Sequence, residues 1–311
     1  MKKRQLLYGL ATFVPGVTKL AGRGAGSSAS AGYCYSVWFR HLVLAGHSGL
    51  NTVPATVAEL GPGSSLGIGL AALLCGSERY LAFDVVAHAR PSQNLAVLEE
   101  LVALFARRAD IPDAQAFPEI FPRLDSYAFP KHLLSEQRLQ AALSPGRIER
   151  LRASLLNPKA RDSLVQYRAP WSSEAVLERE TVDMIVSQAV LEHVDDLQGT
   201  YRAMRAWLRP GGFISHQVDF RCHNTAEGWN GHLAYSDLVW KLIRGKRPYL
   251  INRETFSGHL RMLGEEGFAR PYTRPSQLPS SVQRNKVAPR FLDVPESDFT
   301  TCDAFIQAER L

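Results

Sequence analysis

The stretch VAELGPGSS, Val57–Ser65, decides the fold of this 311-residue chain, together with YLAFD at Tyr80–Asp84. Each begins as the apolar run of a buried strand. The first continues into a glycine turn and a helix start, and the second ends in a carboxylate. Glycines let a backbone approach a ligand closely, and an acid after the second strand can accept hydrogen bonds from both ribose hydroxyls. The pattern therefore predicts a site for an adenosine-containing cofactor.

The details of the glycine turn indicate which cofactor binds. A dinucleotide fold needs Gly-x-Gly-x-x-Gly to cradle a pyrophosphate, but here Gly61 and Gly63 are followed by Gly67, one place too late. Glu59, at the end of the first strand, would repel a pyrophosphate and attract an ammonium group. S-adenosylmethionine carries an ammonium, a sulfonium and no phosphate. Glu-x-Gly-x-Gly therefore resembles the first motif of the class I S-adenosylmethionine-dependent methyltransferases.

A second segment strengthens this resemblance. VDMIVSQAVLEHV, Val182–Val194, is an apolar strand that runs into a short polar stretch, and apolar residues at helical spacing follow in Asp196–Leu208. Arg209–Gly212, with its proline and glycines, is expected to stop that helix and turn the chain into a strand at Phe213–Phe220. The order is similar to the fourth strand, helix and fifth strand of small-molecule methyltransferases of the type 11 kind, with their LEHV and LRPGG signatures.

The resemblance covers Val57–Asp84 and Val165–Leu311 and implies an α/β fold. We expect a doubly wound, seven-stranded, mostly parallel sheet of Rossmann-like methyltransferase type, with an antiparallel last strand and helical insertions. The expected domains are an N-terminal helical cap at 1–50 and a methyltransferase domain at 51–311. The latter would contain a helical insertion at 109–160 and a substrate loop at 221–251, since both stretches exceed what a minimal fold needs.

The later elements follow the same pattern. We expect the third strand at Leu164–Arg168, a helix at Asn252–Glu266, a sixth strand at Gly267–Tyr272 and a closing strand at Asp303–Glu309. Family members often place an acid after the third strand to bind the adenine amino group. Here Trp171 follows instead, so backbone contacts and aromatic stacking are the substitutes that we expect.

The cofactor residues follow from the strand ends, where ligands of open α/β sheets bind. The resemblance implies that Glu59, Gly61 and Gly63 hold the methionine part of S-adenosylmethionine. Asp84 would hold the ribose. The donor would also contact two residues from the fourth strand, Ser187 and Gln188.

Candidate catalytic residues lie after the fourth and fifth strands. His193 is the first choice for a general base, because histidine titrates near neutral pH, and Asp219 could accept a proton or orient an imidazole. Strand alternation places His216 on the opposite face from Asp219, which favours a packed histidine. The candidate substrate-binding residues in the loop are His223, Trp229, His232 and Tyr235. No known ligand spacing supports a metal, and we predict none.

Composition restricts the class of protein. Hydrophobic residues make up 45% of the chain, which describes a globular protein with a large core. The net charge of +6 is weak support for an anionic substrate or surface. The cysteines, Cys34, Cys75, Cys222 and Cys302, form no Cys-x-x-Cys pair, which argues against a zinc framework and favours a reducing compartment.

The N-terminus resembles a secretory signal, with a basic start, a short apolar run at Leu6–Val14 and small residues at Ala21–Gly32. A cytosolic methyl donor argues against export, and the run is too short to span a bilayer. We expect a cytoplasmic protein in which this helix packs on the domain or touches a membrane surface. The aromatic stretch Tyr33–His41 is expected to be a helix near the pocket, from which Tyr33, Tyr35 and Arg40 could reach a ligand.

The function that these patterns favour is methyl transfer to an oxygen, in preference to nitrogen or carbon, of a small molecule or glycan. Nucleic acid is not the expected acceptor, because the fourth strand ends in SQAV (Ser187–Val190) and lacks the Asn/Asp-Pro-Pro-Tyr/Phe of enzymes that methylate DNA amino groups. Two alternatives stay open. One is a dinucleotide-dependent oxidoreductase or epimerase, and the other is a non-catalytic binding module that keeps the cofactor fold.

Overall fold

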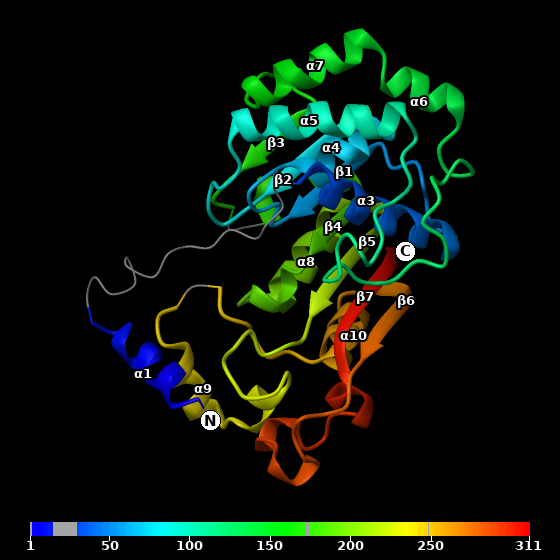
Figure 1. The fold of residues 1–311 in the computed structure, drawn as a ribbon. Helices are drawn as coiled ribbons and strands as arrows, with labels where there is room; N and C mark the ends of the chain where they lie inside the picture. The colour runs from blue at the N-terminus through cyan, green and yellow to red at the C-terminus, as the bar shows by residue number, and fades with distance from the viewer. Residues whose placement is uncertain (1, 15–29, 172–173, 248) are drawn as a thin grey trace.

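A computed structural model describes residues 2–14, 30–171, 174–247 and 249–311 (Figure 1). Its centre is a seven-stranded sheet in the order β3-β2-β1-β4-β5-β7-β6. The strands from β3 to β5 are parallel, and β7 is antiparallel to both of its neighbours. The predicted fold, with its antiparallel last strand, is therefore confirmed. The strands are β1 (Thr56–Leu60), β2 (Arg79–Phe83), β3 (Val165–Arg168), β4 (Val182–Gln188), β5 (Leu208–Asp219), β6 (Phe268–Gln277) and β7 (Thr301–Arg310).

Helices cover both faces of the sheet, and strand alternation divides the core between them. Val57 and Tyr80 pack with the helices of one face, whereas their neighbours Ala58 and Leu81 pack with those of the other. The first face carries α3 (Ala31–His47), α4 (Gly67–Leu74) and α5 (Pro91–Ala106). The second face carries α8 (Leu197–Trp207) and α10 (Phe256–Glu265). The α3 helix, expected in the N-terminal cap, is thus part of the main core.

The chain after α8 turns where the sequence predicts, and only the start of β5 lies earlier than expected. Strand β5 begins at Leu208, directly after the helix, and Leu208 pairs with Val182 across a register shift. Arg209–Gly212 have no partner in β4 and form an irregular turn with Gly211 at a φ angle of +76°, after which regular pairing resumes at Phe213. Helix α10 begins at Phe256, later than expected, since the Thr255 side chain accepts a hydrogen bond from the Gly258 N–H at its N-cap. Strand β6 extends beyond the predicted end, as far as Gln277.

The expected insertion at 109–160 contains α6 (Glu136–Ala142) and α7 (Pro145–Leu156), which pack beside α4 and α5 (Figure 1). The stretch before α6 lies on α3, where the buried Arg40 donates from Nε to the Pro122 carbonyl at 3.0 Å. It also reaches the end of β5, since the Arg221 guanidinium lies 5.6 Å from the Phe121 ring centroid. One part of the insertion therefore approaches the carboxyl edge of the sheet.

The N-terminal segment forms α1 (Lys3–Ala11), which packs against α9 (Asp237–Arg244) (Figure 1). Residues 15–29, which include most of the small-residue stretch, lie outside the described residues. Among the described helices, none has the length and apolar character needed to cross a membrane. The four cysteines are free thiols and buried.

Candidate active site

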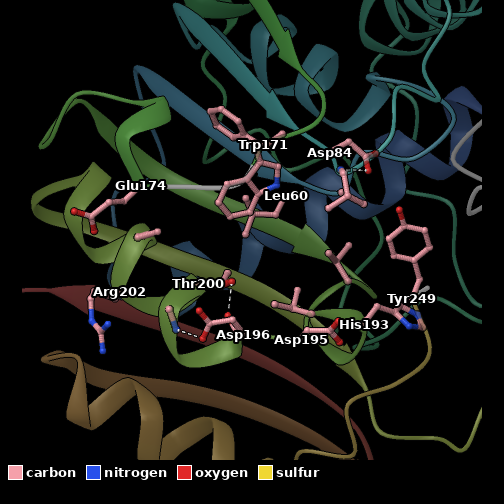
Figure 2. A pocket seen from close by; sticks show the side chains of 17 residues that line it. Leu60, Asp84, Trp171, Glu174, His193, Asp195, Asp196, Thr200, Arg202 and Tyr249 are labelled. Carbon is pink, nitrogen blue, oxygen red and sulfur yellow. Dashed lines mark hydrogen bonds between the residues drawn. The ribbon is translucent and has the colours of Figure 1, made fainter. Parts of the chain in front are cut away.

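A cavity of about 560 Å³ opens at the carboxyl ends of β1, β2 and β4 (Figure 2). This is the edge where the sequence places ligand-binding groups, because the parallel strands all end there. The residues that line it include Gly61, Asp84, Trp171, Val190, His193 and Tyr249. The cavity therefore brings together three of the predicted groups: the glycine turn, the acid of the second strand and the histidine after the fourth.

The charges on the cavity wall are mainly negative. Among the described residues, four carboxylates line it, those of Asp84, Glu174, Asp195 and Asp196, against one guanidinium, that of Arg202. Asp195 also forms an ion pair with Arg244, outside the lining. A wall of this charge is unfavourable for a pyrophosphate and suits a ligand that carries a sulfonium and an ammonium.

The glycine turn and the acid of β2 hold each other in place. Gly61 and Gly63 have φ angles of +65° and +73°, which favour glycine. The Gly63 N–H donates to Asp84 Oδ2 at 3.3 Å, and the Val85 N–H donates to Asp84 Oδ1 at 2.7 Å. A Cβ on Gly61 would lie 2.7 Å from a methyl group of Val190. The carboxylate is thus oriented by the backbone at the point where a ribose acceptor is expected.

Trp171 stands at the position after the third strand where the resemblance implied an acid. It lies after β3, its ring centroid is 6.1 Å from that of Phe83 and 5.4 Å from that of Trp207, and it lines the cavity (Figure 2). An aromatic ring held by two others is a rigid surface on which a flat base can stack. The geometry is compatible with the aromatic substitute expected from the sequence.

Glu59 lies behind the glycine turn and outside the cavity lining. The Tyr80 hydroxyl donates to its Oε2 at 2.5 Å, and the side chain is buried. Burial raises the pKa of Glu59 to about 8, despite the opposing effect of this hydrogen bond. The carboxyl group is therefore mostly neutral at pH 7 in this structure, whereas the sequence argument assumed a negative charge.

Ser187 and Gln188, expected to contact the donor, have partners within the protein instead. Ser187 Oγ lies 2.8 Å from Nδ1 of His216, and Gln188 Nε2 donates to Gln217 Oε1 at 3.0 Å. Neither lines the described cavity. His216 is fully buried on the side of α8 and α10, in agreement with the packed histidine expected from strand alternation. The predicted contact of Ser187 and Gln188 with the methyl donor stays a prediction.

Two histidines and an aspartate meet at the ends of β4 and β5. The ring centroids of His193 and His223 are 5.0 Å apart, and His223 Nε2 lies 3.3 Å from Asp219 Oδ2. Burial, and secondarily His223, lower the pKa of His193 to about 4. Burial alone would raise the pKa of Asp219, but hydrogen bonds from His223 and from the Arg221 backbone outweigh it and hold this pKa below its usual value.

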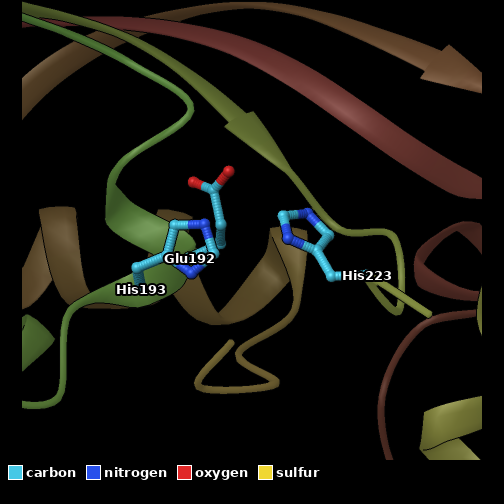
Figure 3. Close-up of side chains that lie close together, drawn as sticks. All are labelled: Glu192, His193 and His223. Carbon is cyan, nitrogen blue, oxygen red and sulfur yellow. The ribbon is translucent and has the colours of Figure 1, made fainter. Parts of the chain in front are cut away.

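Glu192 completes a cluster that the sequence argument missed. Its carboxylate and the two imidazoles of His193 and His223 offer ligand atoms within 4.8 Å of one another (Figure 3). Neither Glu192 oxygen has a partner at full hydrogen-bond geometry among the described residues. The nearby backbone N–H groups of Glu192 and Asp219 lower the pKa of Glu192, but less than burial raises it. Burial raises the pKa of Glu192 well above its usual range. Its place in LEHV, beside His193, was the signal available.

The predicted substrate residues are dispersed along the loop. His223 joins the cluster, and the buried His232 is close enough to it for the charges of His223 and Asp219 to affect its pKa, which burial lowers to about 3. Trp229 Nε1 donates to the Pro279 carbonyl, and the Tyr235 hydroxyl donates to the Thr225 carbonyl. None of these four residues lines the described cavity.

The residues expected to reach the pocket from α3 have other roles. The Tyr35 hydroxyl donates to the Ala109 carbonyl at 2.6 Å, and the side chains of Tyr35 and Arg40 are buried against the insertion. The Tyr33 ring packs edge-on against Phe117 at 5.8 Å. The helix therefore anchors the insertion, which the periodicity of the sequence could not indicate.

Comparison with known proteins adds a family match. Residues 132–215 match a family model described as a methyltransferase domain. No curated protein matches the chain.

Solved structures of similar fold include the carbon methyltransferase CurJ (15% identity, 82% of this chain, 48% of that chain, TM-score 0.36). An S-adenosylmethionine-dependent methyltransferase from Mesorhizobium loti is 15% identical, with 87% and 98% coverage and a TM-score of 0.41. Phosphoethanolamine N-methyltransferase 2 of Haemonchus contortus, in complex with S-adenosyl-L-methionine, is 12% identical, with 88% and 52% coverage and a TM-score of 0.42. The chain thus spans about half the length of the first and the third.

The family match covers β3, β4, α8 and the first part of β5, which surround one side of the cavity. The strand order with an antiparallel β7 and the acid-lined cavity beside the glycine turn agree with it. Residues 132–215 are therefore similar to a methyltransferase domain, within a seven-stranded sheet of the kind expected from the sequence.

Proposed function

We propose that the chain transfers the methyl group of S-adenosylmethionine to a hydroxyl oxygen of a small molecule or glycan. The observation that carries this proposal is the group of His193, His223 and Asp219 beside the cofactor cavity. Methyl transfer from a sulfonium is an in-line displacement that requires an oriented acceptor. A hydroxyl acceptor also requires a group that takes its proton, and an imidazole beside a carboxylate suits that task.

The cofactor would be held by groups around the glycine turn. Asp84 would accept hydrogen bonds from the ribose hydroxyls, and Trp171 would stack on the adenine. The backbone of Gly61 and Gly63 would hold the amino-acid part. Glu59, Ser187 and Gln188 would support these groups from behind, through Tyr80, His216 and Gln217 respectively. When bound, the cofactor supplies an electrophilic methyl group and a neutral thioether leaving group.

His223 would take the proton, and His193 would orient the acceptor. Asp219 contacts Nε2 of His223 and so leaves Nδ1 for the acceptor hydroxyl. As the acceptor oxygen takes up the methyl group that the bound cofactor supplies, Nδ1 of His223 would accept the hydroxyl proton. His193, neutral at pH 7 because of its low pKa, would hydrogen-bond the same oxygen.

The loop at 221–251 would shape the acceptor site. It starts at the catalytic group with Arg221 and His223, and it carries Trp229, His232 and Tyr235. Of these, Trp229 is partly exposed, and an accessible aromatic ring suits a sugar, whose faces stack on rings. A glycan or another polyhydroxylated molecule is therefore the acceptor class that we favour.

A second candidate is metal-assisted methylation, and the close grouping of ligand atoms from Glu192, His193 and His223 favours it. A divalent cation held by Glu192, His193 and His223 would bind the acceptor oxygen and lower its pKa. Asp219 would then orient a metal-bound imidazole, as carboxylates commonly do. Dialysis against EDTA separates the two candidates: activity that survives it excludes the metal route, and activity restored only by Mg²⁺ or Mn²⁺ supports it.

The test of the proposed function uses S-adenosylmethionine labelled in its methyl group. The protein would be incubated with nucleotide sugars and free sugars as hydroxyl probes, and with phosphoethanolamine as an amine probe. We expect label in an O-methyl group, and loss of transfer in His223→Gln with S-adenosylmethionine binding unchanged by calorimetry. Label on the amine alone would refute oxygen as the acceptor. Transfer that persists in His223→Gln would refute the assigned base.

A further inference from the structure

The N-terminal helix is fixed to the domain by one of its faces. A Cβ on Gly9 would lie 2.1 Å from the Leu242 carbonyl oxygen, so α1 and α9 are in close backbone contact. The Lys246 N–H donates to Thr12 Oγ1 at 2.8 Å, and Arg247 Nη1 donates to Gln5 Oε1 at 2.8 Å. Gln5, Gly9 and Thr12 are spaced so that they lie on one face of the helix, the face toward α9.

The opposite face of this segment is apolar and exposed. Leu7, Leu10 and Val14 are 66%, 41% and 57% exposed. The rings of Tyr8 and Phe13 are also exposed, and they lie under the cations of Arg247 and Lys246, at 5.2 and 5.6 Å. A helix that needed only to pack on α9 would carry polar residues on this outer face. The apolar face together with its basic border forms one surface, called here the α1 surface.

The charge of the chain is concentrated at the same end. The first 58 residues contain six Lys and Arg residues and no Asp or Glu, since Glu59 is the first acid of the sequence. The whole chain has 36 basic and 30 acidic residues. The remaining residues therefore carry 30 of each, and the net charge of +6 comes entirely from the first 58. Three of these six, Lys2, Lys3 and Arg4, lie at the start of α1.

We propose that the α1 surface docks on a bilayer that contains anionic phospholipids. A nine-residue helix is about 14 Å long at 1.5 Å per residue, too short to cross a bilayer but suited to lie in its interface. Leu7, Leu10 and Val14 would enter the acyl boundary while the lysines and arginines pair with lipid phosphates. A lipid surface accepts such a mixed face without a shape-matched partner, and the excess of positive charge selects anionic lipids.

The helix on which α1 packs is followed in the sequence by a residue that lines the cofactor cavity. Helix α9 leads through Arg247 to Tyr249, which lines that cavity. Docking would therefore place a bilayer close to the side of the domain where Tyr249 and His193 stand. The inference does not depend on the methyl acceptor, because its test measures lipid binding alone.

The test is co-sedimentation of the full chain with vesicles of phosphatidylcholine, alone or mixed with phosphatidylglycerol. We expect binding to the mixed vesicles, and at least a tenfold weaker binding, on the order of 1.4 kcal/mol, for the double variant Leu7→Glu, Leu10→Glu. The matched control is Leu156→Glu, at the end of α7, where the leucine is 65% exposed. This control should bind like the unchanged protein.

Three outcomes would overturn the proposal. The first is no binding of the unchanged protein to mixed vesicles. The second is equal binding to phosphatidylcholine alone, which would remove the role of the charge. The third is a loss in the Leu156→Glu control as large as in the double variant. The substituted side chains are all on the surface, so we expect each variant to fold. Circular dichroism and S-adenosylmethionine binding of each variant would check this.

Discussion

Gly69 in α4 allows this helix to pack directly against the ring of Tyr80 in β2. A Cβ on Gly69 would lie 2.0 to 2.3 Å from three atoms of the Tyr80 ring. That ring is fully buried, and its hydroxyl donates to Glu59, so it cannot move aside cheaply. Gly69→Ala would therefore force α4 away from β2, at a cost of about 1–3 kcal/mol for overpacking. Losing the partner of the buried Glu59 would add about 1–3 kcal/mol.

The helical preference of alanine offsets about 1 kcal/mol of this, so we expect a net loss of about 1–5 kcal/mol. Urea unfolding followed by circular dichroism measures it. The matched control is Gly264→Ala in α10, where nothing lies within 4 Å of the new Cβ and a small gain is expected. If Gly69→Ala were as stable as Gly264→Ala, the close packing inferred here would be refuted.

Three further results are expected. Asp84→Ala should weaken S-adenosylmethionine binding about 10- to 100-fold by calorimetry, since hydrogen bonds to a charged group contribute about 1.5–3 kcal/mol; the exposed Asp125→Ala should leave it unchanged. Asp219→Asn should lower kcat about 10²–10⁴-fold, as loss of general-base catalysis does, with the dissociation constant of S-adenosylmethionine kept; equal effects on both would contradict a role in proton transfer. Folding raises the pKa of Glu59 from 4.5 to about 8, so the folded protein binds this proton more tightly than the unfolded chain does. The stabilisation that follows is complete below pH 4.5 and is lost as the pH rises through 8. At 1.36 kcal/mol per pH unit the loss is up to about 5 kcal/mol, and Glu59→Gln should flatten the decline in urea stability between pH 5 and 9; an unchanged slope would mean that Glu59 is charged in the folded protein.

Local patterns predicted most of the secondary structure. The apolar runs at Val57 and Val182 are strands because each is buried on both faces, and short continuous apolar runs signal that. The helix stop expected at Arg209–Gly212 is confirmed, since α8 ends at Trp207 and Gly211 has a φ angle of +76° before the regular pairing with β4 begins at Phe213. The start of α10 was placed too early. The helix begins after Thr255 because its side chain accepts a hydrogen bond from the Gly258 N–H, and a threonine in the sequence does not by itself show that this bond forms.

The candidate site was predictable in part. Gly61, Asp84 and His193 follow directly after strands, so a parallel sheet must bring them to one edge, and they line one cavity. Ser187 also follows the pattern of β4, but its side chain faces His216 because alternation along the strand decides which face a residue occupies. Glu192 was missed, since burial without a partner is a property of the packed structure and has no signature in the sequence.

The sequence by itself determined the order of strands and helices and the glycine turn with its acids, because these depend on residue type and on spacing along the chain. Only the tertiary structure decided that Glu59 turns inward to Tyr80, that Glu192 joins His193 and His223, and that α1 packs on α9 with its apolar face outward. The physical reason is that each of these depends on contacts between segments far apart in the chain. Burial and partners across such contacts set the charge and direction of a side chain, and neither is encoded in its immediate neighbours.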